Sequence, residues 1–243
     1  MFSNLFNYDN PVWRFMGKFF DVMILNILWI ICSIPIVTMG ASTTAVYYVT
    51  LRLVRDEEGT SIIKDYFHSF KQNFKQSTII WLILLVVGGA LAADVYIFWF
   101  AMTGNQTIRY IALAVCAGFG IAYICVLMFV FPLQSRFYNS IKRTMFNAFL
   151  LSLRHLFATL SMLIVDIAIP LLALTFVPIL QPILFMFGFP LLLYINSYFL
   201  APVLEKYMPK KEEVSDELEI PKALLEDEES EEMTEKTTEE TYE

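Results

Sequence analysis

Long apolar runs separated by polar segments dominate the chain. Each run approaches the roughly 20 residues that a helix needs to cross about 30 Å of hydrocarbon. The pattern predicts transmembrane helices at about residues 20–39, 78–100, 110–131, 156–177 and 181–201. We therefore expect an all-α fold, a polytopic transmembrane helix bundle of about five spans.

The end of the first run contains residues that interrupt and restart helices: Pro35, Gly40, Ser42, Thr43 and Thr44. Proline kinks a helix because it lacks an N–H donor, whereas Ser and Thr favour helix N-caps. A second helix should therefore begin near residue 43 and extend to about 56, which is too short to span alone. As an alternative, residues 20–54 form a re-entrant or hairpin element, which leaves four full spans.

Two polar segments carry apolar side chains at helical spacing. In residues 60–77, Phe67, Phe70 and Phe74 alternate with Lys and Gln residues, and residues 135–155 have a similar composition. Such patterns are typical of amphipathic helices at a membrane surface. We expect two interfacial helices along the inner surface, each leading into a span.

The formal net charge of −7 conceals a division of the chain. Residues 1–211 hold 15 basic and 9 acidic side chains, whereas residues 212–243 hold 2 basic and 15 acidic ones. From about residue 209 the chain is too poor in large apolar residues to fold alone. We predict a transmembrane helical domain at 1–208 and a disordered acidic cytoplasmic tail at 209–243.

Basic residues near the ends of spans predict orientation, because they are retained on the cytoplasmic side. The expected inner loops carry a basic cytoplasmic surface: Arg52, Arg55, Lys71, Lys75, Arg136, Lys142 and Arg143. The C-terminus should therefore be cytoplasmic. Five spans then place the N-terminus outside, in mild conflict with Arg14 and Lys18, whereas the hairpin alternative places it inside. The sequence leaves both arrangements open.

Three polar side chains within the apolar runs form the candidate intramembrane polar site: Asp166, Asp94 and Asn26. A carboxylate in the bilayer costs about 2.5–3.5 kcal/mol on insertion scales and should find a partner or water. Asp166 lies nearest the expected midplane, one turn before Pro170. It is either a proton or ligand site, or a hydrogen-bonded side chain that fixes helix packing. Asp94 should lie within reach of Arg109.

Signatures of enzymes are absent from the sequence. It contains no zinc-protease, nucleophile-elbow, P-loop or dinucleotide-binding motif. The two histidines, His68 and His155, lie apart in basic amphipathic segments. We expect no catalytic activity, no cofactor and no metal site. Orientation and anionic lipid explain the basic residues, so nucleic acid is not an expected partner.

Four short runs carry a family resemblance: Asn26-Ile27-Leu28-Trp29, SIPIVTMGASTTA from Ser33 to Ala45, Tyr47-Tyr48, and SFKQNFKQ from Ser69 to Gln76. Through these runs, residues 10–100 resemble the YesL family of bacterial membrane proteins, while beyond them only hydropathy agrees. The resemblance implies a multi-pass protein of a bacterial cytoplasmic membrane. It implies architecture and context rather than active-site residues.

Members of the YesL family are often encoded beside carbohydrate-uptake and glycan-degradation genes. This context implies an accessory or assembly partner of a carbohydrate uptake system, which would bind a membrane transporter subunit. The residues themselves leave an alternative, a small solute transporter or channel that uses Asp166 near the midplane.

Overall fold

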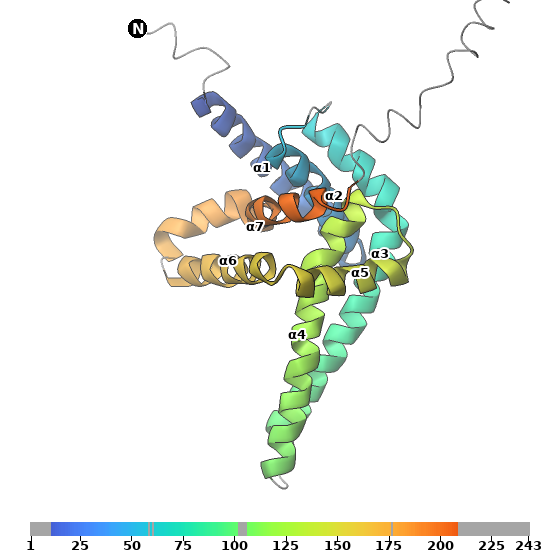
Figure 1. Cartoon of the computed structure of the whole chain (residues 1–243). Helices are drawn as coiled ribbons and strands as arrows, with labels where there is room; N and C mark the ends of the chain where they lie inside the picture. Colours follow the sequence, from blue (N-terminus) through green and yellow to red (C-terminus); the bar gives the residue numbers. More distant parts are fainter. Residues whose placement is uncertain (1–10, 58, 60, 102–105, 176, 209–243) are drawn as a thin grey trace, which may run out of the picture. The chain divides into compact units, whose positions relative to one another are not determined.

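The computed structural model in Figure 1 describes residues 11–57, 59, 61–101, 106–175 and 177–208. Within these residues every regular element is a helix: α1 (Pro11–Ser33), the short 3-10 helix η2 (Ile36–Thr38), α2 (Met39–Val54), α3 (Ile62–Tyr96), the π-helical turn η3 (Ile97–Ala101), α4 (Gln106–Arg136), α5 (Ile141–Arg154), α6 (Leu156–Thr175) and α7 (Val177–Glu205). The all-α prediction is confirmed. Residues up to Leu204 belong to one compact unit, within which all contacts below lie.

Four helical stretches of the described chain are long and apolar enough to cross a bilayer: Met16–Ser33, Ile62–Phe100, Gln106–Arg136 and Met186–Glu205. The pair Ile141–Arg154 and Leu156–Leu172 is bent by 96° and would make a fifth as one broken span. The chain is thus a helical membrane protein. The tail predicted at 209–243 lies outside the described residues.

The first predicted span and the helix after it begin earlier than expected. α1 ends at Ser33, because the residue before Pro35 is driven out of the helical region. α2 already begins at Met39, after η2 has turned the chain. Thr38 stabilises this turn, since its hydroxyl donates to the carbonyls of Cys32 and Pro35, at 2.6 and 2.8 Å.

The N-cap interpretation of Ser42, Thr43 and Thr44 is therefore wrong. The N-cap residue of α2 is Thr38, which makes no side-chain capping bond, and the three hydroxyls lie inside the helix. They bond to neighbouring helices instead. Trp29 Nε1 donates to Thr43 Oγ1 at 3.2 Å, Ser42 Oγ lies 2.7 Å from Tyr66 Oη, and Thr44 Oγ1 lies 2.9 Å from Ser77 Oγ.

α3 also departs from the prediction, because it contains no break near residue 77. The segment expected to lie on the membrane surface is the first half of one continuous helix. The reason is its polar face: Tyr66, Ser69, Asn73 and Ser77 are buried in the bundle rather than exposed to water. α5, in contrast, is a separate helix at the expected place.

α2 is the buried centre of the bundle, since twelve of its sixteen residues are buried. It packs against α1, α3 and α4, and Thr50 Oγ1 lies 2.8 Å from Ser197 Oγ of α7. α3 and α4 run side by side as a hairpin beyond it (Figure 1). The outer faces of this hairpin are apolar, and Val86, Phe119 and Ile121 are 73%, 64% and 65% exposed. Such faces suit lipid or another membrane protein.

Gly40 allows the close approach of α2 to α3. A β-carbon at this position would lie 2.6 Å from the carbonyl oxygen of Ser77 and 3.3 Å from the ring of Phe131. We predict that Gly40→Ala lowers the free energy of unfolding by about 1–3 kcal/mol, because backbone cannot yield as a side chain does. The measurement is thermal unfolding in detergent.

The matched control is Gly89→Ala in α3, where nothing lies within 4 Å of the added carbon. This substitution should leave stability unchanged or raise it by up to about 1 kcal/mol through helix propensity. Equal losses at both positions would contradict the packing of α2 on α3.

Candidate functional site

A tight turn at the end of α2 places a group of charged residues over its last helical turn. Asp56 adopts a left-handed conformation with φ of 50°, and the N–H of Glu57 donates to the carbonyl of Arg52 at 3.1 Å. This is the pattern by which helices commonly terminate. This turn places Glu57 beside Arg55 and Arg136, and Asp56 beside Lys18.

Arg52 forms an ion pair with Asp65 in the first turn of α3, and the two side chains are only 10% and 14% exposed. Gly59 makes room for this pair, because a β-carbon there would collide with the guanidinium of Arg52. A buried ion pair must be well satisfied, since either charge alone would be expensive to bury. The pair therefore fixes the register of α2 against α3.

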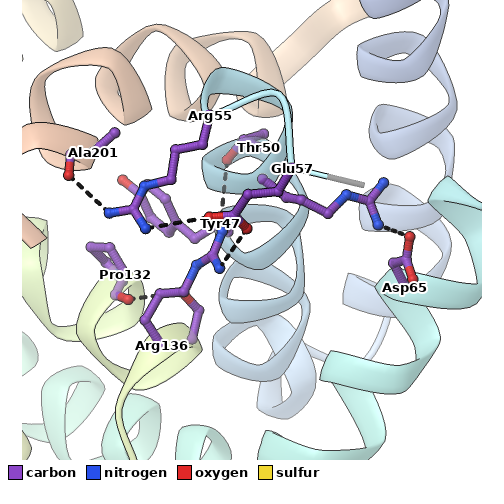
Figure 2. A network of polar contacts seen from close by, with 10 residues as sticks. Tyr47, Thr50, Arg55, Glu57, Asp65, Pro132, Arg136 and Ala201 are labelled. Carbon is purple, nitrogen blue, oxygen red and sulfur yellow. Dashed lines mark hydrogen bonds and ion pairs between the residues drawn. The ribbon is translucent and has the colours of Figure 1, made fainter. Parts of the chain in front are cut away.

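Glu57 joins two further arginines, as Figure 2 shows. Its Oε1 accepts from Arg55 Nη1 at 3.4 Å, and its Oε2 accepts from Arg136 Nη1 of α4 at 3.0 Å. Arg55 also donates through Nη2 to the carbonyl of Ala201 in α7, at 2.9 Å. Glu57 and Arg55 together link α2 to α4 and α7. We call Arg52, Arg55, Glu57, Asp65 and Arg136 the charged network.

An ion pair beside the charged network locates the start of α1. Lys18 Nζ lies 2.7 Å from Asp56 Oδ1, so α1 begins at the end of the bundle where α2 finishes. The starts of α1 and α3 therefore meet the ends of α2, α4 and α7. With five spans, the N-terminus and the end of the last helix would lie on different sides of the membrane. This geometry favours the alternative in which the first two helices form a hairpin.

Only some of the residues predicted to form the basic surface are exposed. Lys71, Lys75, Lys142 and Arg143 are exposed, as expected. Arg52, Arg55 and Arg136 are instead paired in the charged network, with side chains 10–15% exposed. For these three the prediction is wrong, because charge counting does not include the acidic partners that folding brings to them.

A second polar cluster lies between α2, α6 and α7. Asn196 Nδ2 donates to Asp166 Oδ1 at 2.9 Å, and Asn196 also hydrogen-bonds to Tyr47 of α2. Asn196 and Tyr47 are 2% and 5% exposed, whereas Asp166 is partly exposed. We call these three residues the Asp166 cluster. The sequence identified the aspartate but missed Tyr47, and a useful signal was the pair Asn196-Ser197 within an apolar run.

Asn26 and Asp94 do not join Asp166. Asn26 Nδ2 donates to the carbonyl of Met186 at 3.0 Å, beside the break at Gly188, where φ is 47°. A β-carbon at Gly188 would collide with the amide of Asn26, so this contact holds α1 to the bend of α7.

Asp94 is exposed near the end of α3, and none of the ion pairs found among the described residues includes it. The guanidinium of Arg109, its expected partner, lies over the ring of Tyr110 at 5.4 Å. The three candidate residues thus occupy separate places. In the described part of the chain, no group of three His, Cys, Asp or Glu side chains could hold a metal ion.

The buried helix α2 and its ion pair with α3 lie in a segment that matches a protein family. Residues 22–95 match the family described as protein of unknown function, DUF624. No curated protein and no solved structure matches the chain. The DUF624 segment contains most of α1, all of α2 and nearly all of α3.

The DUF624 segment holds the hydroxyl contacts of α2 with α1 and α3 and the Arg52–Asp65 pair. Further partners of α2 and of the turn after it lie beyond the segment, namely Arg136, Asn196, Ser197 and Ala201. The segment therefore contains both partners of the hydroxyl contacts that join α2 to α1 and α3. Its polar contacts with the residues beyond it need α4 and α7.

The buried pair in the DUF624 segment yields a double-mutant prediction. Arg52→Met should destabilise the protein by about 3–5 kcal/mol, because it leaves Asp65 nearly buried without its cation. Adding Asp65→Leu to it should recover most of this loss, since two apolar side chains then replace the pair. The measurement is the free energy of unfolding in detergent.

The control is the more exposed pair of Lys18 and Asp56, whose side chains are 25% and 55% exposed. Lys18→Met should change stability by less than about 1 kcal/mol. A double variant that is as unstable as Arg52→Met alone would show that the two charges are not coupled.

Proposed function

We propose that this chain is a YesL-family protein of a bacterial cytoplasmic membrane that serves as an accessory or assembly partner of a carbohydrate uptake system. It binds a membrane transporter subunit and carries out no reaction itself. The observation that carries the proposal is the use of polar groups in the bundle. The hydroxyl and charged groups of α2 form hydrogen bonds and an ion pair with neighbouring helices, while the outer faces of α3 and α4 are apolar.

The polar groups of the described helices are poorly suited to binding a sugar. Sugar sites need several convergent polar groups beside aromatic faces, so that many hydroxyls are satisfied together. Asn26 bonds to the carbonyl of Met186, and Asn196 bonds to Asp166. Their amides hold helices together, which supports a role beside the sugar-handling subunit. The carbohydrate context itself comes from the YesL resemblance.

The α3–α4 hairpin offers a surface for a partner helix. Gly118 and Gly120 of α4 have nothing within 4 Å of an added β-carbon, whereas Gly88 of α3 faces the hydroxyl of Tyr123. Gly88 therefore serves packing inside the hairpin, and Gly120 lies on an open face between exposed apolar residues. Small residues on such faces allow close helix contact in membranes.

The charged network supports a cytoplasmic position for both ends of the membrane domain. Its three arginines and the nearby Lys18 lie at one end of the bundle, and basic residues mark the cytoplasmic ends of spans. With α1 and α2 as a hairpin, the N-terminus lies inside. The conflict that Arg14 and Lys18 posed for five spans then disappears.

A second candidate function is transport of a small solute through Asp166. The observation that favours it is the series of polar contacts along α2 and α7. These contacts run from the Asp166 cluster through Thr50 and Ser197 to Arg55 and Ala201. From Tyr47 to Arg55 this series covers about 12 Å of helical rise.

Copurification tests the accessory role. The tagged chain, extracted from native membranes in mild detergent, should recover a transporter permease identifiable by mass spectrometry. Gly120→Leu should lower that recovery about tenfold, the effect of a clash of about 1.4 kcal/mol. Gly17→Leu, at another open position, is the matched control and should not lower it. Absence of any partner, together with solute flux by the purified chain alone, would reject the role and favour the transporter.

Cysteine labelling tests the arrangement of the first two helices. In a variant without Cys32, Cys116 and Cys125, a cysteine replacing Leu5 should react with an impermeant maleimide only after the membrane is opened. A cysteine replacing Gly104, between α3 and α4, should react in intact cells. Reaction of the Leu5 position in intact cells would restore the arrangement with five spans.

A further inference from the structure

The Asp166 cluster contains a buried acceptor without a donor. Asn196 Nδ2 donates to Asp166, but Asn196 Oδ1 has no hydrogen-bond partner among the described residues, although Asn196 is only 2% exposed. A buried polar atom that lacks a partner destabilises the folded protein unless something else satisfies it. The missing partner must bring a hydrogen-bond donor or a positive charge.

Other atoms of the cluster have the same character. Asp166 contributes a carboxylate whose Oδ1 accepts from Asn196. Pro170 is the residue four positions later within α6, and it has no N–H to offer the backbone carbonyl of Asp166. Tyr47 adds a phenolic oxygen. Oxygen acceptors from three helices therefore gather at one place.

The cluster contains one carboxyl group and no basic side chain. None of the ion pairs formed by the described residues includes Asp166, and the arginines of α2 bond to Asp65, Glu57 and Ala201 instead. Asp166 is partly exposed, while Asn196 and Tyr47 lie behind it. Asp166 is therefore the most accessible member of the cluster.

We propose that the Asp166 cluster binds a monovalent alkali cation, held by the carboxylate of Asp166, the amide oxygen of Asn196 and the phenolic oxygen of Tyr47. One carboxylate neutralises one positive charge, and the remaining ligands are neutral oxygens. Calcium and magnesium are hard ions that favour additional carboxylates or several retained waters. The proposal goes beyond the accessory role and does not depend on it, because a bound ion can stabilise the junction of α2, α6 and α7 without being transported.

The test uses the purified full-length chain in detergent and sodium as the probe. The midpoint of thermal unfolding, Tm, is compared in sodium chloride and in choline chloride at equal ionic strength and pH, which separates binding from general screening. A ligand that binds only the folded state at about a hundred times its Kd should raise Tm by about 5–10 °C for a chain of this size. Titration with sodium then gives the apparent Kd.

Three variants assign the effect to the cluster. Asp166→Asn should abolish the sodium-dependent rise, because it removes the charge while retaining size and hydrogen bonding. Tyr47→Phe should weaken sodium binding without abolishing it, and it keeps the test decisive if Asp166→Asn fails to fold. Asp94→Asn, at the exposed carboxylate of α3, is the matched control and should keep the full rise.

Several results would overturn the proposal. Equal Tm values in sodium and choline would show that no alkali ion binds. A sodium-dependent rise that survives both Asp166→Asn and Tyr47→Phe would place the ion elsewhere. A rise that follows pH in choline and is indifferent to sodium would show that a proton alone satisfies Asp166.

Discussion

A polar helix buried on all sides is the constraint on which the rest of this structure depends. α2 brings hydroxyl, phenol and guanidinium groups into a bundle that has little water, and each such group needs a partner on a neighbouring helix. Ser42 and Thr44 therefore fix α3, Thr43 fixes α1, and Thr50 fixes α7. An apolar helix could slide or rotate among its neighbours at little cost, whereas α2 can satisfy its polar groups in one register only.

The fold class followed from the sequence because the length of an apolar run is a local property, and the bilayer sets that length. α6 and α7 begin within a few residues of the expected positions for this reason. The start of α2 was misplaced because Ser and Thr were assumed to bond their own backbone. In a membrane the same hydroxyls serve other helices, and no local pattern shows which. The break expected in α3 failed for a related reason, since a polar face suits a buried helix as well as the membrane surface.

The sites depended still more on distant partners. Asp166 stood out because a carboxylate is rare in an apolar run, but its neighbours Asn196 and Tyr47 lie 30 and 119 positions away in the chain. The arginines of the charged network were predicted to be exposed, but they are paired in the bundle. Charge counting could not show this, because Glu57 and Asp65 come next to them only after folding. Residue type can indicate that a group needs a partner, while only the assembled helices show which group supplies it.

The bond from Arg55 to Ala201 has a consequence for the order of synthesis. Its two residues are separated by 146 positions, so at about 5–20 residues per second the ribosome needs roughly 7–30 s to produce the acceptor after the donor. During that interval α2 has already been made, but Arg55 lacks its hydrogen bond to Ala201. The DUF624 segment can form its own hydroxyl contacts meanwhile. The contact between α2 and α7 through Arg55 and Ala201 can therefore form only after α7 has been made.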